Sequence, residues 1–228
     1  MTDHQLYDQL SSFISPNKRA LFETIAPLRT RHLTVVLEDI YQSQNASAVV
    51  RTCDLVGVQD VHVIENRNAY QLNPDVTLGS SKWVDVLRYR DHPDNTGNCV
   101  AHLREQGYRI IATSPRGKDI TPGNIPLDRP LAICFGTELT GLSDALMDVA
   151  DEHLRIPMYG FTESFNISAS AAIVLYTLMQ RLRESDVPWH LSDGALIALK
   201  LSWARKLVHS PAHLEERIRR DAARDELI

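Results

Sequence analysis

From residue 33 onward, the sequence alternates short runs of β-branched and apolar residues with stretches of helical periodicity. The predicted strands cover 33–39, 61–65, 84–89, 109–114, 130–136 and 153–158. Helical patterns fill the intervals at 45–56, at 96–106, after Ser143 and after Asn166. Strands that alternate with helices in this way form parallel sheets covered by helices. The pattern therefore predicts an α/β fold with a mostly parallel sheet.

Helical patterns without strands flank this region. Two short ones, split by Pro16, precede residue 33, and two more follow Pro188. We therefore expect an N-terminal helical extension over 1–32, one α/β domain over 33–185 and a C-terminal helical extension over 186–228.

Composition narrows the class of protein. The 228 residues are 43% hydrophobic, which is enough to bury a core, and no apolar run reaches the roughly 18 residues of a membrane span. The N-terminus lacks the basic start and apolar centre of a signal peptide, so we expect a cytoplasmic protein. The net charge of −5 argues against a chain that coats nucleic acid indiscriminately, yet it permits a local basic patch. The cysteines form no C-x-x-C pair and are predicted to be buried free thiols at Cys53, Cys99 and Cys134.

The stretch CFGTELTG at 134–141 carries two glycines after an apolar run. A phosphate-binding loop of the G-x-x-x-x-G-K-[ST] type needs lysine directly after its second glycine, where this chain has Leu142. The Glu138 carboxylate would also repel a phosphate. Gly136 would let a ligand approach the backbone, and Gly141 would permit a turn before Ser143 caps the next helix. The loop is either a site for another kind of ligand at the end of a strand or a plain turn.

Two further polar clusters also follow predicted strands. In NASAVVRTCD, at 45–54, Asn45 is a predicted N-cap and an apolar stripe leaves Arg51 on the opposite face, where it could simply pair with Asp54. In IPMYGFTESFNISAS, at 156–170, a polar loop with Ser164 and Asn166 precedes a helix that opens with small residues. These two side chains have a simpler role open to them as helix caps.

Taken in order, the three clusters resemble the motifs of a known family. N-x-x-x-x-x-R begins at Asn45, F-G-x-E-x-x-G at Phe135, and I-P-M-x-G followed by S-F-N-x-S at Ile156. They are similar to the three motifs of the SPOUT methyltransferases, specifically the TrmH class of tRNA ribose 2′-O-methyltransferases. The resemblance covers about residues 33–183, and the region after Pro188 matches no family pattern that we identify.

The resemblance implies a fold, a cofactor and an assembly. The C-terminal part of the α/β domain would be threaded into a deep trefoil knot, which is a rare exception to unknotted topology. The loops of the knot would hold S-adenosylmethionine, and the protein would act as a homodimer through the long helix after Asn166, with Ala172, Val174 and Leu175 at the interface. Matching positions give the cofactor contacts as Thr113, Gly136, Ile156 and Phe165. A positively charged sulfonium tolerates the carboxylate of Glu138, which a phosphate would not.

The same resemblance assigns the chemistry. Arg51 would bind the neighbouring phosphate and position or polarise the ribose hydroxyl, because a guanidinium stays protonated in water and is a poor general base. Glu138 would organise the loop and Arg51, and the pocket would be completed by Asn45, Ser164 and Asn166. We expect no metal to be needed for transfer, since the methyl donor is already activated.

The implied substrate is a guanosine in the D-loop of tRNA. Another tRNA nucleotide or ribosomal RNA is the alternative within the class, and a non-catalytic RNA-binding relic is the alternative outside it. A small-molecule hydrolase is disfavoured because the chain has no G-x-S-x-G elbow. Basic residues of the terminal helices would grip the tRNA, namely Lys18, Arg19, Lys200, Arg205 and Lys206.

Overall fold

The computed structural model describes residues 1–115 and 120–225. The chain divides into two compact units. One is the terminal unit, Met1–Arg29 together with His190–Ile228, and the other is the α/β unit, Thr30–Trp189. No helix within the described ranges is long and apolar enough to cross a membrane.

The α/β unit contains a six-stranded sheet in the order β3-β2-β1-β5-β4-β6, and every neighbouring pair of strands is parallel. In chain order the strands are β1 (Leu33–Glu38), β2 (Asp60–Ile64), β3 (Asp85–Tyr89), β4 (Arg109–Thr113), β5 (Leu131–Phe135) and β6 (Glu152–Leu154). The predicted parallel α/β fold is thus confirmed. The sixth strand is shorter than the predicted 153–158, because Arg155 turns its N–H to Ile120 O and Pro157 has no N–H to continue a ladder.

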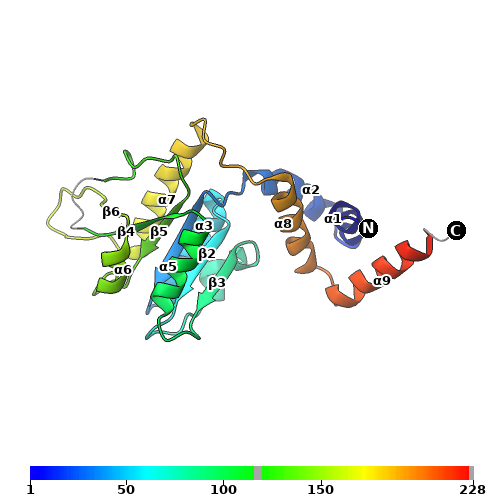
Figure 1. Cartoon of the computed structure of the whole chain (residues 1–228), viewed down its shortest axis with the longest axis horizontal. Coiled ribbons are helices and arrows are strands. Elements are labelled where there is room, and N and C mark those ends of the chain that lie inside the picture. Colours follow the sequence, from blue (N-terminus) through cyan, green and yellow to red (C-terminus); the bar gives the residue numbers. More distant parts are fainter. Residues whose placement is uncertain (116–119, 226–228) are drawn as a thin grey trace. The chain divides into compact units, whose positions relative to one another are not determined.

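Helices cover both faces of this sheet (Figure 1). They are α3 (Ser43–Val56), α4 (Pro74–Thr77), η2 (Ser80–Lys82), α5 (Asn95–Glu105), α6 (Asp144–Val149) and α7 (Ile167–Arg183). Successive strand residues point to opposite faces, so Val35 packs in the core cluster with α3 and α7, whereas Val36 packs in the cluster with α5 and α6. Both faces are therefore buried, which is why the strands read as continuous apolar runs.

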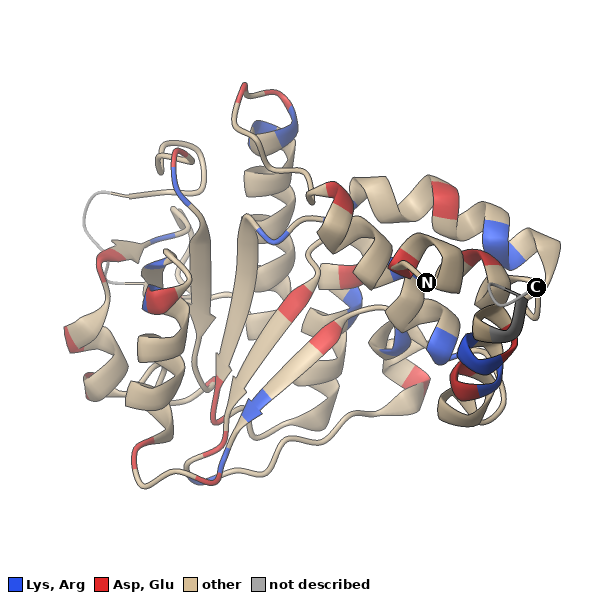
Figure 2. Ribbon diagram, turned by 45° about the vertical axis from the view of Figure 1, so that its right-hand side comes forward, with Lys and Arg blue, Asp and Glu red and all other residues tan. Residues whose placement is uncertain are grey.

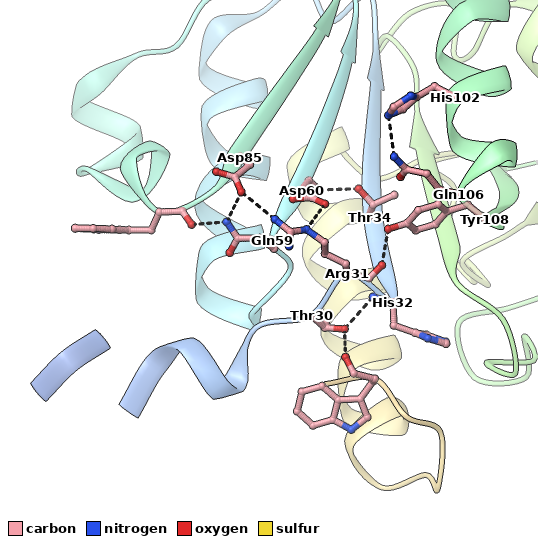
Figure 3. Close-up of polar contacts among 12 residues, drawn as sticks. Thr30, Arg31, His32, Thr34, Gln59, Asp60, Asp85, His102, Gln106 and Tyr108 are labelled. Carbon is pink, nitrogen blue, oxygen red and sulfur yellow. Dashed lines mark hydrogen bonds and ion pairs between the residues drawn. The ribbon is translucent and has the colours of Figure 1, made fainter. Parts of the chain in front are cut away.

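The amino-terminal edge of the sheet is closed by paired polar groups (Figure 3). Arg31 Nε lies 2.8 Å from Asp60 Oδ2, and its Nη2 lies 3.3 Å from Asp85 Oδ2. Gln59 donates to the same Asp85 oxygen at 3.1 Å, and the Tyr108 hydroxyl donates to Arg31 O at 2.5 Å. The charged groups at the amino edge thus pair with one another and stabilise this end of the sheet. We therefore expect a ligand site at the opposite end, where the strands have their carboxyl ends.

The terminal unit is a small helical body with its own core. It contains α1 (Asp3–Ser11), α2 (Pro16–Ile25), η1 (Ala26–Leu28), α8 (Asp193–Arg205) and α9 (Pro211–Asp225). Leu6, Leu10 and Phe22 are buried there, and the ring of Phe22 packs on Trp203 of α8 with centroids 5.3 Å apart. Residues from both ends of the chain therefore build one core.

Candidate active site

The sheet topology creates a crevice between β1 and β5. The chain leaves β1 toward α3 on one face of the sheet and leaves β5 toward α6 on the other face. In parallel sheets, ligands bind at the carboxyl ends of strands where neighbouring connections diverge in this way. The sequence cluster at 45–54 lies in α3, on one side of this crevice, and the cluster at 134–141 forms the end of β5 and the loop on the other side.

Three side chains meet here, one from the first turn of α3, one from the loop after β5 and one from the N-cap of α7. Asn45 Nδ2 donates to Glu138 Oε1, and Asn166 Nδ2 donates to Asn45 Oδ1 at 3.2 Å. Asn45 is 7% exposed, so its amide is held among its partners and is shielded from water. The structure thus brings together Asn45, Glu138 and Asn166, which are 121 residues apart at the extremes. We call these three residues the polar triad.

Asn45 does not cap its helix, and that sequence prediction is wrong. α3 starts at Ser43 after the N-cap Gln42, so Asn45 lies in the first turn. Its amide donates to Gln42 Oε1 at 3.0 Å as well as to Glu138, and is therefore engaged across the crevice. Two predicted caps are confirmed: Asn166 accepts from Ser168 N at 2.8 Å, and Ser143 accepts from Leu146 N at 3.2 Å. Ser164, the alternative cap for the same helix as Asn166, precedes the helix by three residues and does not cap it.

Arg51 lies further along α3 and is exposed. Its Nη1 donates to Val76 O at 3.5 Å, and not to Asp54 as the simpler sequence interpretation had it. Within the described residues it also makes no ion pair with Glu138, contrary to our expectation that Glu138 organises this arginine. Six residues of helix place Arg51 about 9 Å along the axis from Asn45. The guanidinium is exposed and, apart from this one hydrogen bond to Val76 O, has donors available to an anion.

Glu138 sits at the tip of a loop that closes tightly at its base. Thr137 and Gly141 exchange two backbone hydrogen bonds of 3.0 Å each. A Cβ atom on Gly136 would overlap the backbone of Gly141 and Leu142, and Gly141 has φ +73°. Only glycine allows both the close approach at Gly136 and the left-handed turn at Gly141. The loop FGTELTG is thus a fixed turn that presents a carboxylate.

The four predicted cofactor positions lie at the ends of β4, β5 and β6 or in the loops that follow. Thr113 Oγ1 donates to Cys134 O at 2.7 Å and joins β4 to β5. Ile156 is half-buried against the core, whereas the Phe165 ring is 46% exposed. Apolar side chains beside a closely approached backbone suit the adenine and ribose of a nucleoside cofactor. Ser164 lies exposed in the same loop as Phe165.

One hollow lies in each of the two units of the described structure near residues of interest. One of about 370 Å³ lies in the α/β unit beside the loops after β4 and β6, and is lined by Pro115, Met158, Gly160, Phe161, Thr162 and Glu163. A larger one of about 460 Å³ lies in the terminal unit, between α1, α2 and α8. There Glu23 accepts from the Tyr7 hydroxyl at 2.9 Å and pairs with Lys200. The polar side chains Tyr7, Glu23 and Lys200 that line the larger hollow thus bind one another. None of the residues of the polar triad lines it.

Sequence reasoning missed one buried carboxylate at the crevice. Glu38, the last residue of β1, is 2% exposed and accepts from Ser143 N, Ser143 Oγ and Thr96 Oγ1 at 2.8, 2.8 and 2.9 Å. A charged residue that closes an otherwise apolar strand was the available signal. Across residues 1–115 and 120–225, no three His, Cys, Asp or Glu side chains are grouped to hold a metal ion. The three cysteines are buried free thiols as predicted, and burial raises the pKa of the Cys99 thiol to about 12.

Comparison with known proteins tests the resemblance directly. A model of the SpoU rRNA Methylase family matches residues 32–176. A tRNA (guanosine(18)-2′-O)-methyltransferase of Borreliella burgdorferi is 46% identical over 209 residues, which is 92% of this chain and 94% of that protein. The enzyme of the same name from Escherichia coli strain K12 is 33% identical over 75% of this chain and 73% of its own.

A solved structure agrees. The crystal structure of the Aquifex aeolicus TrmH/SpoU tRNA modifying enzyme superimposes with a TM-score of 0.74 at 27% identity, covering 85% of this chain and 98% of that one. The resemblance to the TrmH class is confirmed, and the chain belongs to the SpoU rRNA methylase family.

Proposed function

We propose that this protein transfers a methyl group from S-adenosylmethionine to the ribose 2′-OH of a guanosine in the D-loop of tRNA. The observation that carries the proposal is the polar triad, in which one residue from each of the three family motifs meets at the carboxyl edge of the sheet. The relatives named above act on guanosine 18 of tRNA, and this chain matches the Borreliella enzyme over nearly its whole length. We expect the protein to work in the cytoplasm, where its substrate is.

The proposed chemistry is a displacement at carbon. S-adenosylmethionine, when bound, supplies an electrophilic methyl group on a sulfonium centre. The ribose 2′-oxygen forms the new O–CH3 bond and loses its proton, while the electron pair of the broken C–S bond stays on sulfur. Alignment of these atoms is the main contribution that a protein can make to such a transfer.

The residues of the crevice divide this work. Arg51 binds the phosphate next to the target ribose and polarises the hydroxyl, because it is exposed and carries several donors in a planar array. The polar triad gives the ribose fixed donors and acceptors, and Ser164 adds a hydroxyl from the neighbouring loop. Gly136, Ile156, Phe165 and the end of β4 at Thr113 hold the cofactor. No metal is required for this assignment.

The fold proposal includes the trefoil knot. The segment between β4 and β5 contacts β6 and α7, which come later in the chain. Ile120 forms a parallel bridge with Leu154 of β6. Arg181 of α7 donates to Pro122 O and Ile125 O at 2.7 and 2.8 Å. In a trefoil knot, a later part of the chain passes through an earlier loop. The segment between β4 and β5 would be that loop, and it contacts the later chain at β6 and α7. These contacts support the knot.

The homodimer is proposed with a revised interface. The prediction that Val174 and Leu175 face a partner is wrong, because both are fully buried within this chain under α3. The exposed apolar residues of α7 are instead Ile173 at 37% and Tyr176 at 60%. Their exposure supports α7 as the surface that a second copy covers.

The tRNA grip of the terminal unit is also proposed with fewer residues. Lys200 is bound to Glu23 with its side chain 13% exposed, and Arg205 binds the Glu215 carboxylate through two hydrogen bonds of 2.6 and 3.1 Å. Both are structural cations. The proposed phosphate contacts are Arg19, which is exposed, together with Lys18 and Lys206, each of which also has contacts within the protein.

A matched pair of substrates tests the proposed function. A tRNA transcript that lacks modifications and the same tRNA with 2′-deoxyguanosine at position 18 are incubated with methyl-labelled S-adenosylmethionine. We expect label in the first RNA only, because the second lacks the attacking oxygen. Equal labelling of both would place the methyl elsewhere, and no labelling of either would leave the RNA-binding relic as the better account.

A further inference from the structure

Glu38 is a buried carboxylate to which the proposed mechanism gives no role. It ends β1 at 2% exposure, and in the described part of the chain its oxygens meet no Lys, Arg or His at ion-pair distance. Burying a carboxylate without a cation costs free energy unless hydrogen bonds replace its hydration. Three donors do so here, and two of them come from one residue, Ser143.

The donors of Glu38 connect three elements at the crevice. Thr96 belongs to the first turn of α5, and Ser143 is the N-cap of α6. Thr96 in turn accepts from Asn66 Nδ2 at 2.9 Å, so the hydroxyl that donates to Glu38 is itself held in place. A carboxylate suits this position because both of its oxygens accept. In a glutamine at this position, the NH2 group would face a donor of Ser143 or Thr96, and that hydrogen bond would be lost.

Ser143 fixes one end of the loop that carries Glu138. The other end is anchored by β5, which finishes at Phe135. Between these anchors the loop is closed by the Thr137–Gly141 pair and by the close approach at Gly136. The place of the Glu138 carboxylate beside Asn45 therefore depends on where Ser143 is held, and Glu38 holds it.

We propose that Glu38 is a positioning residue for methyl transfer, which acts through Ser143 and the loop 136–143 to keep Glu138 on Asn45. The inference rests on the proposed function. Glu38 ends β1 and Asn45 lies in the first turn of α3, the helix that follows β1, so the end of β1 helps to place both the amide and the loop that meets it. The carboxylate thereby couples the first motif to the second without touching the substrate.

A double-mutant cycle tests this role. Glu38→Gln, Glu138→Gln and the double variant are compared in kcat/KM for tRNA methylation. We expect Glu38→Gln to lower kcat/KM by about 10- to 100-fold, as lost support of a site residue does, while the Kd for tRNA stays within a few-fold. If Glu38 acts through Glu138, the double variant loses little more than Glu138→Gln alone. Losses that multiply would overturn the proposal.

Hydrogen exchange gives a second readout that needs no activity. The Gly141 N–H, bonded to Thr137 O, is expected to exchange faster in Glu38→Gln than in the wild type. The matched control is Thr34→Val at the other end of β1, which removes a buried hydrogen bond of 2.8 Å to Asp60 O and should leave the loop unchanged. Unchanged exchange in folded Glu38→Gln would contradict the role.

The two proposals fail separately. A wild-type protein that methylates no tRNA would overturn the proposed function, while the exchange experiment would still decide whether Glu38 holds the loop. If Glu38→Gln does not fold, Ser143→Ala replaces it in both experiments, because it deletes the hydroxyl donor and keeps the Ser143 N–H. The expected and contradicting results are then the same.

Discussion

At the scale of single residues, the candidate site depends on amide and carboxylate groups that satisfy one another across loops. Asn45 uses both ends of its amide, since Nδ2 donates to Glu138 and Oδ1 accepts from Asn166. Such a pair of contacts orients the amide without ambiguity. Arg51 lies outside this arrangement with an exposed guanidinium, which separates the group that we propose to contact RNA from the groups that shape the pocket.

This separation gives a prediction for Arg51→Ala. We expect methyl transfer to fall by several orders of magnitude while the Kd for S-adenosylmethionine, measured by calorimetry, stays within a few-fold. The reason is that Arg51 acts on the RNA phosphate and the ribose hydroxyl. Arg129→Ala, which removes an exposed arginine just before β5, is the control for loss of a positive charge. Loss of cofactor binding in Arg51→Ala would show that the residue has been assigned to the wrong partner.

His62 should make the stability of the protein depend on pH. Its ring is 2% exposed, with Nδ1 2.9 Å from the Tyr89 hydroxyl. Burial, and then the nearby His102, lower its pKa from 6.5 to about 4. Between pH 6.5 and about 4, His62 is therefore protonated in the unfolded chain and neutral in the folded chain. The stabilising contribution is complete above pH 6.5 and is lost as the pH falls toward 4.

The measurement is urea unfolding at pH 7 and pH 5. His62 alone should lower the free energy of unfolding by about 2 kcal/mol between these two pH values. His62→Gln, whose side chain does not titrate, should reduce the difference by that amount. An identical pH dependence in wild type and variant would mean that His62 is already charged in the folded state, or that it titrates normally.

At the scale of elements, the alternation of apolar runs was sufficient to predict the six strands and the four longer helices around them. The periodicity of hydrophobic residues and the polar residues at strand ends are local features of the sequence, so they can be recognised without knowing which residues are in contact. The helix start at Ser43 was missed because Asn45 is the better cap by residue type, yet its amide is used across the crevice. The three-way meeting of the loops and the burial of Glu38 depend on strand order, which no local pattern contains.

The glycine loop gives a prediction at this scale. Gly136→Ala would drive a Cβ into the backbone of Gly141 and Leu142, and because backbone cannot move aside cheaply, the loop must open. We expect cofactor affinity to fall at least tenfold, measured by calorimetry. Gly194→Ala, where a Cβ would meet open space in α8, is the matched control and should bind normally. Normal binding by Gly136→Ala would remove this loop from the cofactor site.

At the scale of the whole molecule, the two chain ends form one helical unit, and its charges are partly used for its own stability. Figure 2 shows Lys and Arg interleaved with Asp and Glu on α9. Lys200 and Arg205 bind carboxylates of the same unit. Deleting everything after Pro188 would also strip Trp203 from Phe22, so point substitutions test the RNA grip better than truncation does.

The substitution test is a salt titration of tRNA binding. For the double variant Arg19→Gln with Lys206→Gln, the logarithm of the tRNA binding constant should fall less steeply with the logarithm of salt concentration. The magnitude of the slope should decrease by about 1.4 to 1.8, since each phosphate contact contributes about 0.7 to 0.9. Lys82→Gln with Arg129→Gln, which removes the same charge beside the amino edge of the sheet, should leave the slope nearly unchanged. Equal slopes for the two double variants would place the grip on another surface.

Methylation of the 2′-oxygen of a D-loop guanosine can be read in cells by mapping 2′-O-methyl groups at nucleotide resolution. Total tRNA from cells that lack this protein is compared with tRNA from the same cells supplied with the wild type or with Arg51→Ala. We expect one methyl group, on guanosine 18, to disappear without the protein, to return with the wild type and not to return with Arg51→Ala. A D-loop methyl group that persists without the protein, or a loss confined to another nucleotide or to ribosomal RNA, would contradict the proposed function.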